Sequence, residues 1–282
     1  MPVLPFACIA TPLTDAAVQN AIDTLGIDPP TFWAILRVET LGCGYLASWR
    51  PQILFERHVF SRLTGGVWDA IAPDVSNPVP GGYGAGGDNQ YARLGKAYNL
   101  NQNDPADPSI PPPTRNAALQ AASWGVGQVL GENATDVGFA SVQDMVMQMC
   151  LSEDRQVAAV VNYILANNLQ DALQAQDWAT YAAEYNGPDY AKNNYDVQLS
   201  QYYALYQSAA SIPDLTVRAG QLLLLLLGYD PMGVDGVQGP HTLAALHNFQ
   251  AAQGQALTVG IDATVVQSLN TALPQPQMLN LG

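Results

Sequence analysis

The sequence predicts a mainly helical protein in which a small β element interrupts the helices and a small three-helix module follows the main domain. Apolar residues recur with the 3.6-residue period of helices along most of the chain. One β-rich run, residues 53–60, leads into a stretch crowded with Gly, Pro and Asn. The helical pattern then breaks at Ser211-Ile-Pro-Asp214. We therefore expect a main domain over residues 1–211 and a C-terminal module over residues 212–282, in line with the usual domain size of ~150 residues.

Start and stop signals place the helices. Thr14 is a suitable N-cap for a first helix that ends at Leu25, before Gly26, and Pro29-Pro30 precedes a second helix over residues 32–41. Residues 101–113, which include five prolines, are expected to form an exposed insertion. The other predicted helices cover residues 89–100, 116–122, 142–150 (behind a Ser141-x-x-Asp144 capping box), 153–166, 178–185 and 190–210 in the main domain, and 217–227, 241–252 and 262–273 in the module.

The charge balance narrows the range of partners. Ten Lys and Arg residues against 24 Asp and Glu residues give a net charge of −14, so nucleic acids and anionic membranes are unfavourable partners. Charged residues make up only 12% of the chain, while hydrophobic residues make up 48%. Hydrogen-bonding groups and aromatic rings must then do most of the recognition, which suits a weakly charged, hydroxyl-rich ligand such as a glycan.

Cysteine, histidine and N-terminal patterns set further limits. Cys8, Cys43 and Cys150 are odd in number and too few for a disulfide framework, which leaves the compartment open. The three histidines follow no metal-binding spacing, so no metal or other cofactor is expected. The first basic residue is Arg37, so no secretory signal is predicted, and the most apolar run, residues 219–229, is about half of a ~20-residue membrane span. We expect a monomer made in the cytoplasm, without membrane insertion.

A carboxylate on an apolar helix face is the main catalytic candidate. In the second predicted helix, Glu39 follows Phe32, Ile35 and Leu36 at helical spacing, so all four share one face. Apolar surroundings disfavour the charged form of a carboxyl group and raise its pKa toward the range in which it can act as a general acid. The alternative is a structural Glu39 that pairs with Arg37 or points into solvent.

Glu56 is the second acidic candidate. Strand alternation would place Leu54, Glu56 and His58 on one face of the β-rich run. A second carboxylate across a cleft could hold water or stabilise an oxocarbenium-like transition state, and the separation of the two carboxylates would decide between inverting and retaining chemistry. A salt bridge from Glu56 to Arg57 or Arg62 is the structural alternative.

Three short motifs occur in a fixed order: Val38-Glu39-Thr40, then Ser123-Trp-Gly-Val-Gly-Gln128, then Glu184-Tyr185-Asn186-Gly187. Together they resemble the lysozyme-like superfamily of goose-type lysozymes and soluble lytic transglycosylases. Longer strings, among them Arg50-Pro-Gln-Ile-Leu-Phe-Glu-Arg-His58, are more specifically similar to the N-acetylmuramidase endolysins of phages and prophages. The resemblance covers residues 31–206 and implies a lysozyme-like α+β catalytic domain, although the insertion at residues 105–113 departs from the family pattern.

The resemblance implies a peptidoglycan hydrolase. Glu39 would protonate the glycosidic oxygen of the β-1,4 bond between N-acetylmuramic acid and N-acetylglucosamine, and Glu56 would be a second catalytic or water-positioning carboxylate. The residues expected to line the sugar cleft are Ser123, Gln128, Tyr185 and Asn186. Attack by water would give a reducing sugar, as in the closer, hydrolytic family, whereas attack by the muramoyl 6-hydroxyl would give a 1,6-anhydro product. Such an enzyme would act in the periplasm or cell wall after release through a membrane lesion.

The C-terminal module resembles three-helix peptidoglycan-binding modules. The string Asp235-Gly236-Val-Gln-Gly239-Pro-His-Thr242, followed by Phe249-Gln250, carries this resemblance. The backbone amides of such a loop could bind a carboxylate of a peptide stem, and wall binding would raise the effective concentration of the enzyme on its polymer. A structural three-helix cap without a ligand is the alternative. The candidate wall-binding residues are Asp235, Gly236, Gly239 and Thr242.

Two other functions remain open on the sequence. Cys43 and His58 could form a Cys-His hydrolase that acts on peptide stems, although Cys43 lies in a glycine turn and no third orienting residue is evident. The second is a non-catalytic cell-wall-binding protein with a lysozyme-like fold. The motifs of serine hydrolases and of phosphate-binding loops are absent from the sequence.

Overall fold

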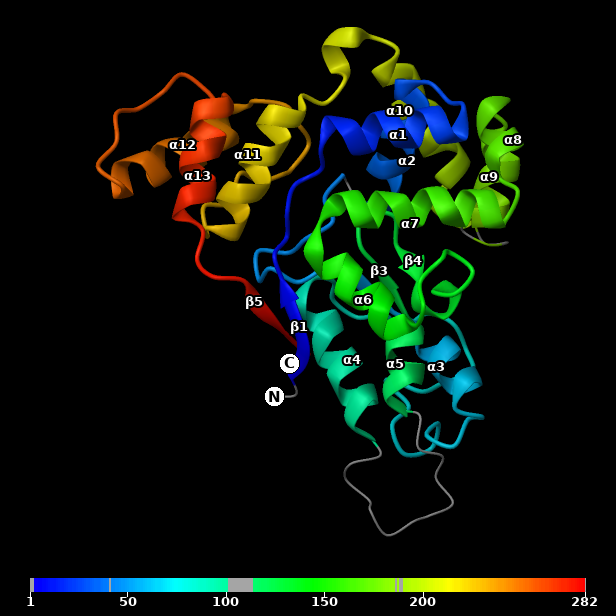
Figure 1. Ribbon diagram of the computed structural model, residues 1–282. Helices are drawn as coiled ribbons and strands as arrows, with labels where there is room; N and C mark the ends of the chain where they lie inside the picture. The colour runs from blue at the N-terminus through cyan, green and yellow to red at the C-terminus, as the bar shows by residue number, and fades with distance from the viewer. Residues whose placement is uncertain (1–2, 41, 101–113, 186, 188–189, 282) are drawn as a thin grey trace.

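The computed structural model describes residues 3–40, 42–100, 114–185, 187 and 190–281. Over these residues the protein is mainly helical, with thirteen α-helices, a three-stranded sheet and a separate two-stranded sheet, which confirms the predicted fold class. The main body has two lobes, and a three-helix module lies beside them (Figure 1). The insertion predicted over residues 101–113 lies outside the described residues.

The first lobe is built from helices. α2 packs mainly on α10, and α1 packs on α7. As the sequence signals predict, Thr14 caps α1 by accepting a hydrogen bond from the Ala17 amide, and Gly26 ends that helix with a left-handed φ of 63°. The helices of this lobe are α1 (Asp15–Leu25), α2 (Pro29–Thr40), α7 (Glu153–Ala166), α8 (Gln170–Gln174), α9 (Trp178–Tyr185) and α10 (Tyr195–Tyr206).

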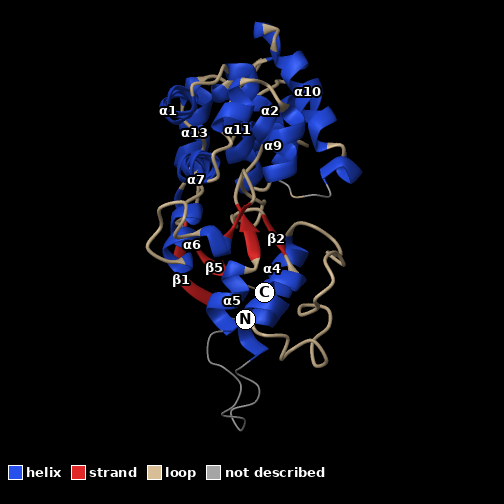
Figure 2. Cartoon of the chain, turned by 90° about the vertical axis from the view of Figure 1, so that its right-hand side faces the viewer, coloured by secondary structure: helices blue, strands red, loops and turns tan. Residues whose placement is uncertain are grey.

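The second lobe surrounds a small antiparallel sheet, which lies between the helical layers in Figure 2. The strands pair in the order β2-β3-β4, and their register places Leu54 opposite Ser123, and Ser123 opposite Leu130. The elements of this lobe are β2 (Ile53–Phe55), α3 (Arg57–Leu63), α4 (Asp88–Asn99), α5 (Thr114–Gln120), β3 (Ala122–Trp124), β4 (Val129–Leu130), the short turn η2 (Gly131–Asn133) and α6 (Val142–Leu151).

The β-rich run predicted over residues 53–60 is wrong in its second half, because the strand ends at Phe55 and α3 begins at Arg57. The Glu56 amide still donates to the Ala121 carbonyl at 2.8 Å, and the backbone that follows turns into the helix. The Phe60 amide donates to the Glu56 carbonyl at 3.1 Å, which starts the helix. Glu56 and His58 therefore lie at the beginning of α3 and do not alternate on a strand face.

The C-terminal module has its own hydrophobic core. Its helices are α11 (Leu215–Leu226), α12 (Pro240–Ala252) and α13 (Ala263–Ala272), and they bury Leu223, Leu246, Phe249 and Leu269 between them. The residues after α13 then leave the module. β5 (Gln277–Asn280) returns to the main body and pairs antiparallel with β1 (Val3–Cys8), so the two ends of the chain lie side by side (Figure 1).

β1 is also attached to α6 of the second lobe. The amides of Ile9 and Ala10 donate to the Cys150 carbonyl at 2.9 and 3.2 Å. Cys8 and Cys150 form a disulfide, a pairing that the odd cysteine count does not predict. The first strand, and through it β5, is thereby held against the main body.

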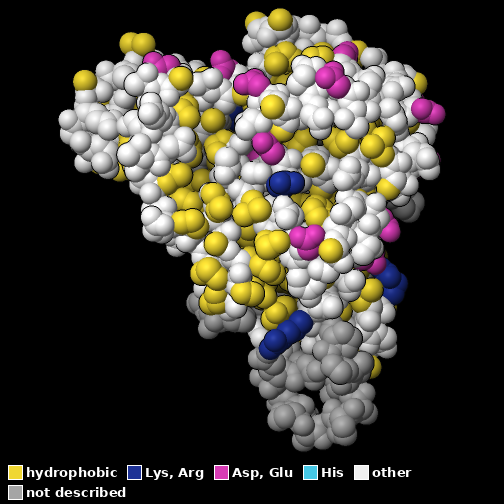
Figure 3. All heavy atoms as spheres, viewed as in Figure 1, with side chains coloured by type: hydrophobic (Ala, Val, Ile, Leu, Met, Phe, Trp, Pro, Cys, Tyr) yellow, Lys and Arg dark blue, Asp and Glu magenta, His cyan; other side chains and the backbone are white. Residues whose placement is uncertain are grey.

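An apolar contact docks the module on the main body. Leu222, Leu226 and Val234 of the module pack with Tyr45 and Trp49, and Trp49 Nε1 donates to the Leu226 carbonyl at 2.9 Å. Hydrophobic side chains gather along this junction in Figure 3, while acidic side chains are scattered over the same face. Some leucines of the apolar run over residues 219–229 therefore face the main body, and others face the core of the module.

Residues 209–226 are the one described segment that is long and apolar enough, by length and composition, to cross a membrane. Half of the segment is buried inside the protein. This segment is not one continuous helix: a short 3-10 turn over Ala209–Ser211 comes first, and the twelve-residue α11 begins after its N-cap residue, Asp214. The leucines of α11 supply the two apolar contacts described above.

Candidate active site

A cleft of about 920 Å³ runs between the helical lobe and the sheet. α2, α7, α9 and α10 contribute to one wall, and the three strands and η2 contribute to the other. Asn186, the sixth residue predicted to act on the substrate, lies outside the described residues. The other five line the cleft: Glu39, Glu56, Ser123, Gln128 and Tyr185.

Glu39 lies in the last turn of α2, where its partly buried side chain lines the cleft. Phe32 and Leu36, which share its helical face, are buried in the core. Arg37 is directed to another helix, because its guanidinium carbon lies 5.6 Å from the centre of the Tyr202 ring in α10. The apolar face thus anchors α2, while its last turn carries a carboxylate to the cleft.

Tyrosines gather around the Glu39 carboxylate. Burial raises the pKa of Tyr163, Tyr185 and Tyr195, and the negative charge of Glu39 raises each of them further. The Tyr185 hydroxyl donates to a backbone carbonyl, that of Gly127, at 2.8 Å, and its ring lies 5.1 Å from the Tyr163 ring in an edge-to-face arrangement. This wall offers flat apolar surface with hydroxyl groups at its edges, as sugar rings require.

Hydrogen bonds attach the end of α2 to the segment that follows β3. The Thr40 hydroxyl donates to the Val126 carbonyl at 2.8 Å, and the Val126 amide donates to Gln156 Oε1 at 2.8 Å. Gly42 has a φ of 87°, which glycine adopts without strain. At Gly44 a Cβ atom would lie 1.9 Å from Gln156 Oε1. In the turn after α2, glycine is therefore required at Gly42 by the backbone conformation and at Gly44 by close packing against Gln156.

The Ser-Trp-Gly motif forms the sheet side of the cleft. Alternation along β3 turns Ser123 to the cleft and buries Trp124, whose Nε1 donates to the Leu119 carbonyl at 3.0 Å. Gln128 has a left-handed φ of 50°, and its Nε2 donates to the Gly125 carbonyl at 2.8 Å. Gln128 therefore stabilises the turn on which it lies, while Ser123 presents its side chain to the cleft.

Glu56 also lines the cleft, beside His58. The distance from His58 Nδ1 to Glu56 Oε2 is 3.2 Å, which fits an ion pair, although the two atoms lack the geometry of a directed hydrogen bond. Burial raises the pKa of Glu56, and His58, the Tyr83 hydroxyl and Arg93 act in the opposite direction. Glu56 is thus a desolvated carboxyl group with an imidazole next to it.

The salt bridge considered between Glu56 and Arg57 or Arg62 is replaced by other contacts of the two arginines. Arg57 Nε donates to the Val79 carbonyl at 3.1 Å, and Arg62 Nη2 lies 2.6 Å from Glu132 Oε2. Glu132 lines the cleft too, which makes it a third carboxylate that sequence reasoning did not select. Within the described part of the chain, no three His, Cys, Asp or Glu side chains are grouped to hold a metal.

The variant Glu56→Gln is expected to gain stability relative to the wild type as the pH rises. Because the folded-state pKa of Glu56 is raised, the wild type loses stability between the ordinary Glu pKa of about 4.3 and the raised folded value. Gln does not titrate, so the difference in free energy of unfolding should move in favour of the variant across this interval and then level off. Urea unfolding of both proteins at a series of pH values measures it. A difference that is constant with pH would contradict the expectation.

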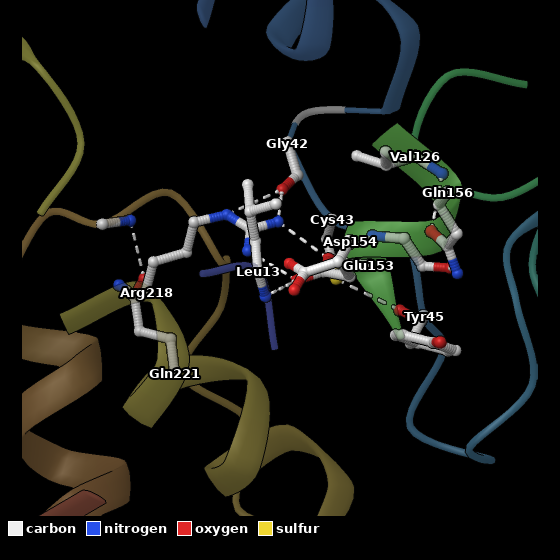
Figure 4. Close-up of polar contacts among 12 residues, drawn as sticks. Leu13, Gly42, Cys43, Tyr45, Val126, Glu153, Asp154, Gln156, Arg218 and Gln221 are labelled. Atoms are coloured by element: carbon white, nitrogen blue, oxygen red, sulfur yellow. Dashed lines mark hydrogen bonds and ion pairs between the residues drawn. The ribbon is translucent and has the colours of Figure 1, made fainter. Parts of the chain in front are cut away.

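Sequence reasoning missed two buried polar residues on α7. Glu153 and Gln156 are 0% and 1% exposed, and they lie one turn apart on the same face of the helix. Glu153 Oε1 accepts the Gly44 amide at 2.9 Å, and Glu153 Oε2 lies 2.6 Å from Arg218 Nη1 of the module (Figure 4). Polar residues at this spacing near a helix start usually mark the solvent face, so the local pattern contained no signal for their burial.

Iodoacetamide is expected to leave the activity of the native protein unchanged. Cys43 is buried, its Sγ lies 3.2 Å from the Tyr45 carbonyl oxygen, and burial together with the charge of Glu153 raises the pKa of the thiol to about 12. Such a thiol is almost fully protonated at neutral pH and is a poor nucleophile. Lysis assays before and after treatment measure the effect, and labelling in urea shows that the reagent is active. Inactivation of the folded protein by iodoacetamide would instead favour a hydrolase that uses Cys43 and His58.

The predicted wall-binding residues build a loop around a buried glutamine. Gln221 Oε1 accepts the amides of Asp235 and Gly236 at 3.0 and 2.8 Å. Gln221 Nε2 lies 3.0 Å from the hydroxyl of Thr242, which is itself buried, and Gly239 is the N-cap residue of α12. The Asp-Gly-x-x-Gly-Pro-x-Thr string therefore has a structural role in this module.

Comparison with known proteins agrees with this geometry. The pattern of the N-acetylmuramidase family matches residues 28–207. Among solved structures, the crystal structure of the Burkholderia AP3 phage endolysin is 37% identical, with a TM-score of 0.60 over 70% of this chain and 72% of that chain. A search of curated proteins found no match. The family match spans both walls of the cleft, so the chain belongs to the N-acetylmuramidase family and is a glycoside hydrolase that acts on peptidoglycan.

Proposed function

We propose that the enzyme cleaves the β-1,4 bond between N-acetylmuramic acid and N-acetylglucosamine with Glu39 as its general acid. The observation that carries this proposal is the place of Glu39, at the end of a helix whose apolar face is buried and at the edge of a cleft walled by tyrosines. A protonated carboxyl group in such surroundings can give its proton to the glycosidic oxygen as the C1–O bond breaks.

Water completes the reaction. Its oxygen forms a bond to C1, one of its protons leaves to a base, and Glu39 is protonated again before the next turnover. Glu56 is the proposed water-positioning carboxylate and base, because it lines the same cleft, with His58 Nδ1 at 3.2 Å from its Oε2. Attack by the muramoyl 6-hydroxyl instead of water would make the enzyme a lytic transglycosylase.

Neutral polar groups and aromatic rings are proposed to bind the sugars. Ser123, Gln128 and Tyr185 line the cleft. The Ser123 hydroxyl can donate and accept, whereas Gln128 Nε2 and the Tyr185 hydroxyl already donate to backbone carbonyls, so the oxygens of these two side chains are proposed to accept from the sugar. Asn186 follows Tyr185 in the chain and is proposed to act with it. A net charge of −14 is compatible with a substrate that is recognised by hydrogen bonding and stacking.

We also propose that cleavage and wall binding are carried out by different parts of the chain. Residues 1–211 would carry out the cleavage, and residues 212–282 would bind the wall, with Asp235, Gly236, Gly239 and Thr242 shaping the loop that faces it. The enzyme would work as a monomer and would meet the wall after release through a membrane lesion. Retention of the full-length variant Glu39→Gln on purified sacculi measures wall binding without digestion.

Mass spectrometry of digested peptidoglycan tests the reaction. Hydrolysis should give disaccharide fragments with reducing N-acetylmuramic acid ends, which borohydride reduces. Anhydro ends, which are lighter by one water and resist borohydride, would show a transglycosylase. Fragments with N-acetylglucosamine at the reducing end, or cleaved peptide stems with an intact glycan, would overturn the proposed bond.

A further inference from the structure

A buried ion pair joins the C-terminal module to the turn that follows the helix of Glu39. Arg218 on α11 is 1% exposed and extends into the main body. Its Nη1 and Nη2 lie 2.6 and 2.7 Å from the two carboxylate oxygens of Glu153, and its Nε donates to the Gly42 carbonyl at 3.1 Å (Figure 4). Nη2 also donates to the Gly42 carbonyl. One guanidinium thus binds α7 and the glycine turn at once.

The Glu153 carboxylate completes this connection. Besides Arg218, it accepts the Gly44 amide on Oε1 at 2.9 Å and the Leu13 amide on Oε2 at 3.0 Å. Four donors therefore satisfy its two oxygens. The turn at Gly42 and Gly44 is held from both sides, by the guanidinium at a carbonyl and by the carboxylate at an amide.

The same face of α7 holds the segment that follows β3. Gln156 Oε1 accepts the Val126 amide at 2.8 Å, and the Val126 carbonyl accepts the Thr40 hydroxyl at 2.8 Å. Thr40 is the residue after Glu39. α7 therefore holds the end of α2 at Thr40, through the segment that follows β3, and the module holds the turn after α2 at Gly42, through Arg218.

The ion pair is not the sole contact that docks the module on the main body. The apolar contact of Leu222, Leu226 and Val234 already joins the two parts, together with the hydrogen bond from Trp49 to the Leu226 carbonyl. A buried ion pair is often no more stabilising than apolar residues of the same volume, so stability alone does not account for it. Unlike the apolar contact, the ion pair makes directional hydrogen bonds. Its guanidinium fixes the position of the Gly42 carbonyl, three residues after Glu39.

We propose that Arg218 is a positioning residue for Glu39, so that the C-terminal module completes the active site of the main body in addition to any role in wall binding. The inference rests on the proposed role of Glu39. Its consequence is that Arg218 affects turnover even on a substrate that the module does not need to bind.

The test uses full-length variants and soluble glycan strands freed of their peptide stems. The double variant Glu153→Gln/Arg218→Met removes both charges, so no unpaired charge is left in the core. Its kcat, normalised to folded protein, is expected to fall about tenfold, because small displacements of a catalytic group are costly. Its KM is expected to stay within about twofold, since ground-state binding is kept. The conservative variant Arg218→Lys keeps the positive charge but loses the planar guanidinium that contacts Gly42 and both oxygens of Glu153 at once. It is expected to recover part of the lost kcat.

Trp49→Phe is the matched control, because it removes a different hydrogen bond between the module and the main body and leaves the hydrogen bonds of Gly42 and Gly44 in place. It should lower Tm and leave kcat unchanged. Wild-type kcat in the double variant, or an equal loss of kcat in Trp49→Phe, would overturn the proposal. Should the double variant not fold, wild-type kcat in Arg218→Lys would overturn it. Glu39→Gln is measured alongside: if that variant is fully active, it is the role of Glu39 that fails.

Discussion

Glu39→Gln is expected to lower kcat on peptidoglycan by about 10²- to 10⁴-fold, the usual contribution of general acid catalysis. The amide has nearly the shape of the carboxyl group but cannot give a proton to the glycosidic oxygen. Because the side chain is only partly buried and lies at the cleft, the substitution should leave the fold intact. Release of reducing ends from purified sacculi measures the rate, and the thermal unfolding midpoint verifies the fold.

Glu184→Gln is the matched control for this prediction. Glu184 lies on α9, is exposed and does not line the cleft, so the same chemical change there should leave kcat as in the wild type. A Glu39→Gln protein that folds and retains more than about one tenth of the wild-type rate would show that the acid lies elsewhere. Glu56 and Glu132 would then be the next residues to substitute, since both line the cleft.

Local signals predicted most of the helices, and the family resemblance of three short motifs predicted residues on both walls of the cleft. The helices over 153–166 and 178–185 have the predicted bounds, because capping residues and apolar periodicity act within one or two turns of the chain. Ser123 and the other cleft residues were predicted from the family resemblance of their motifs, and the strand over residues 122–124 was not predicted.

Features that depend on distant partners could not be predicted in the same way. The strand that ends at Phe55 pairs with Ala122, which lies 67 positions further on. β5 forms because its partner is the first strand of the chain. Glu153 and Arg218 are 65 residues apart, and neither local pattern indicates that the other exists. Pairing, burial and docking are decided by tertiary contacts, which override local preferences.

Arg218→Leu is expected to lower the free energy of unfolding by about 3–5 kcal/mol, the usual loss when one partner of a buried ion pair is removed. The leucine would leave the Glu153 carboxylate, which is 0% exposed, without the guanidinium that binds both of its oxygens. The Gly42 carbonyl would also lose its donor from Arg218. Urea unfolding of the full-length protein at neutral pH measures the change as a shift of the midpoint.

The double variant Glu153→Gln/Arg218→Met separates the cost of an unpaired charge from the cost of the lost contacts. The amide introduced in place of the Glu153 carboxylate would still offer its one carbonyl oxygen to either the Leu13 or the Gly44 amide. The methionine introduced in place of Arg218 would fill part of the space of the arginine stem. If the unpaired charge dominates, the double variant should be more stable than Arg218→Leu although it carries one more substitution. If the double variant is less stable than Arg218→Leu, the hydrogen bonds to the two backbone amides dominate instead, and Glu153 stabilises the glycine turn independently of its charge.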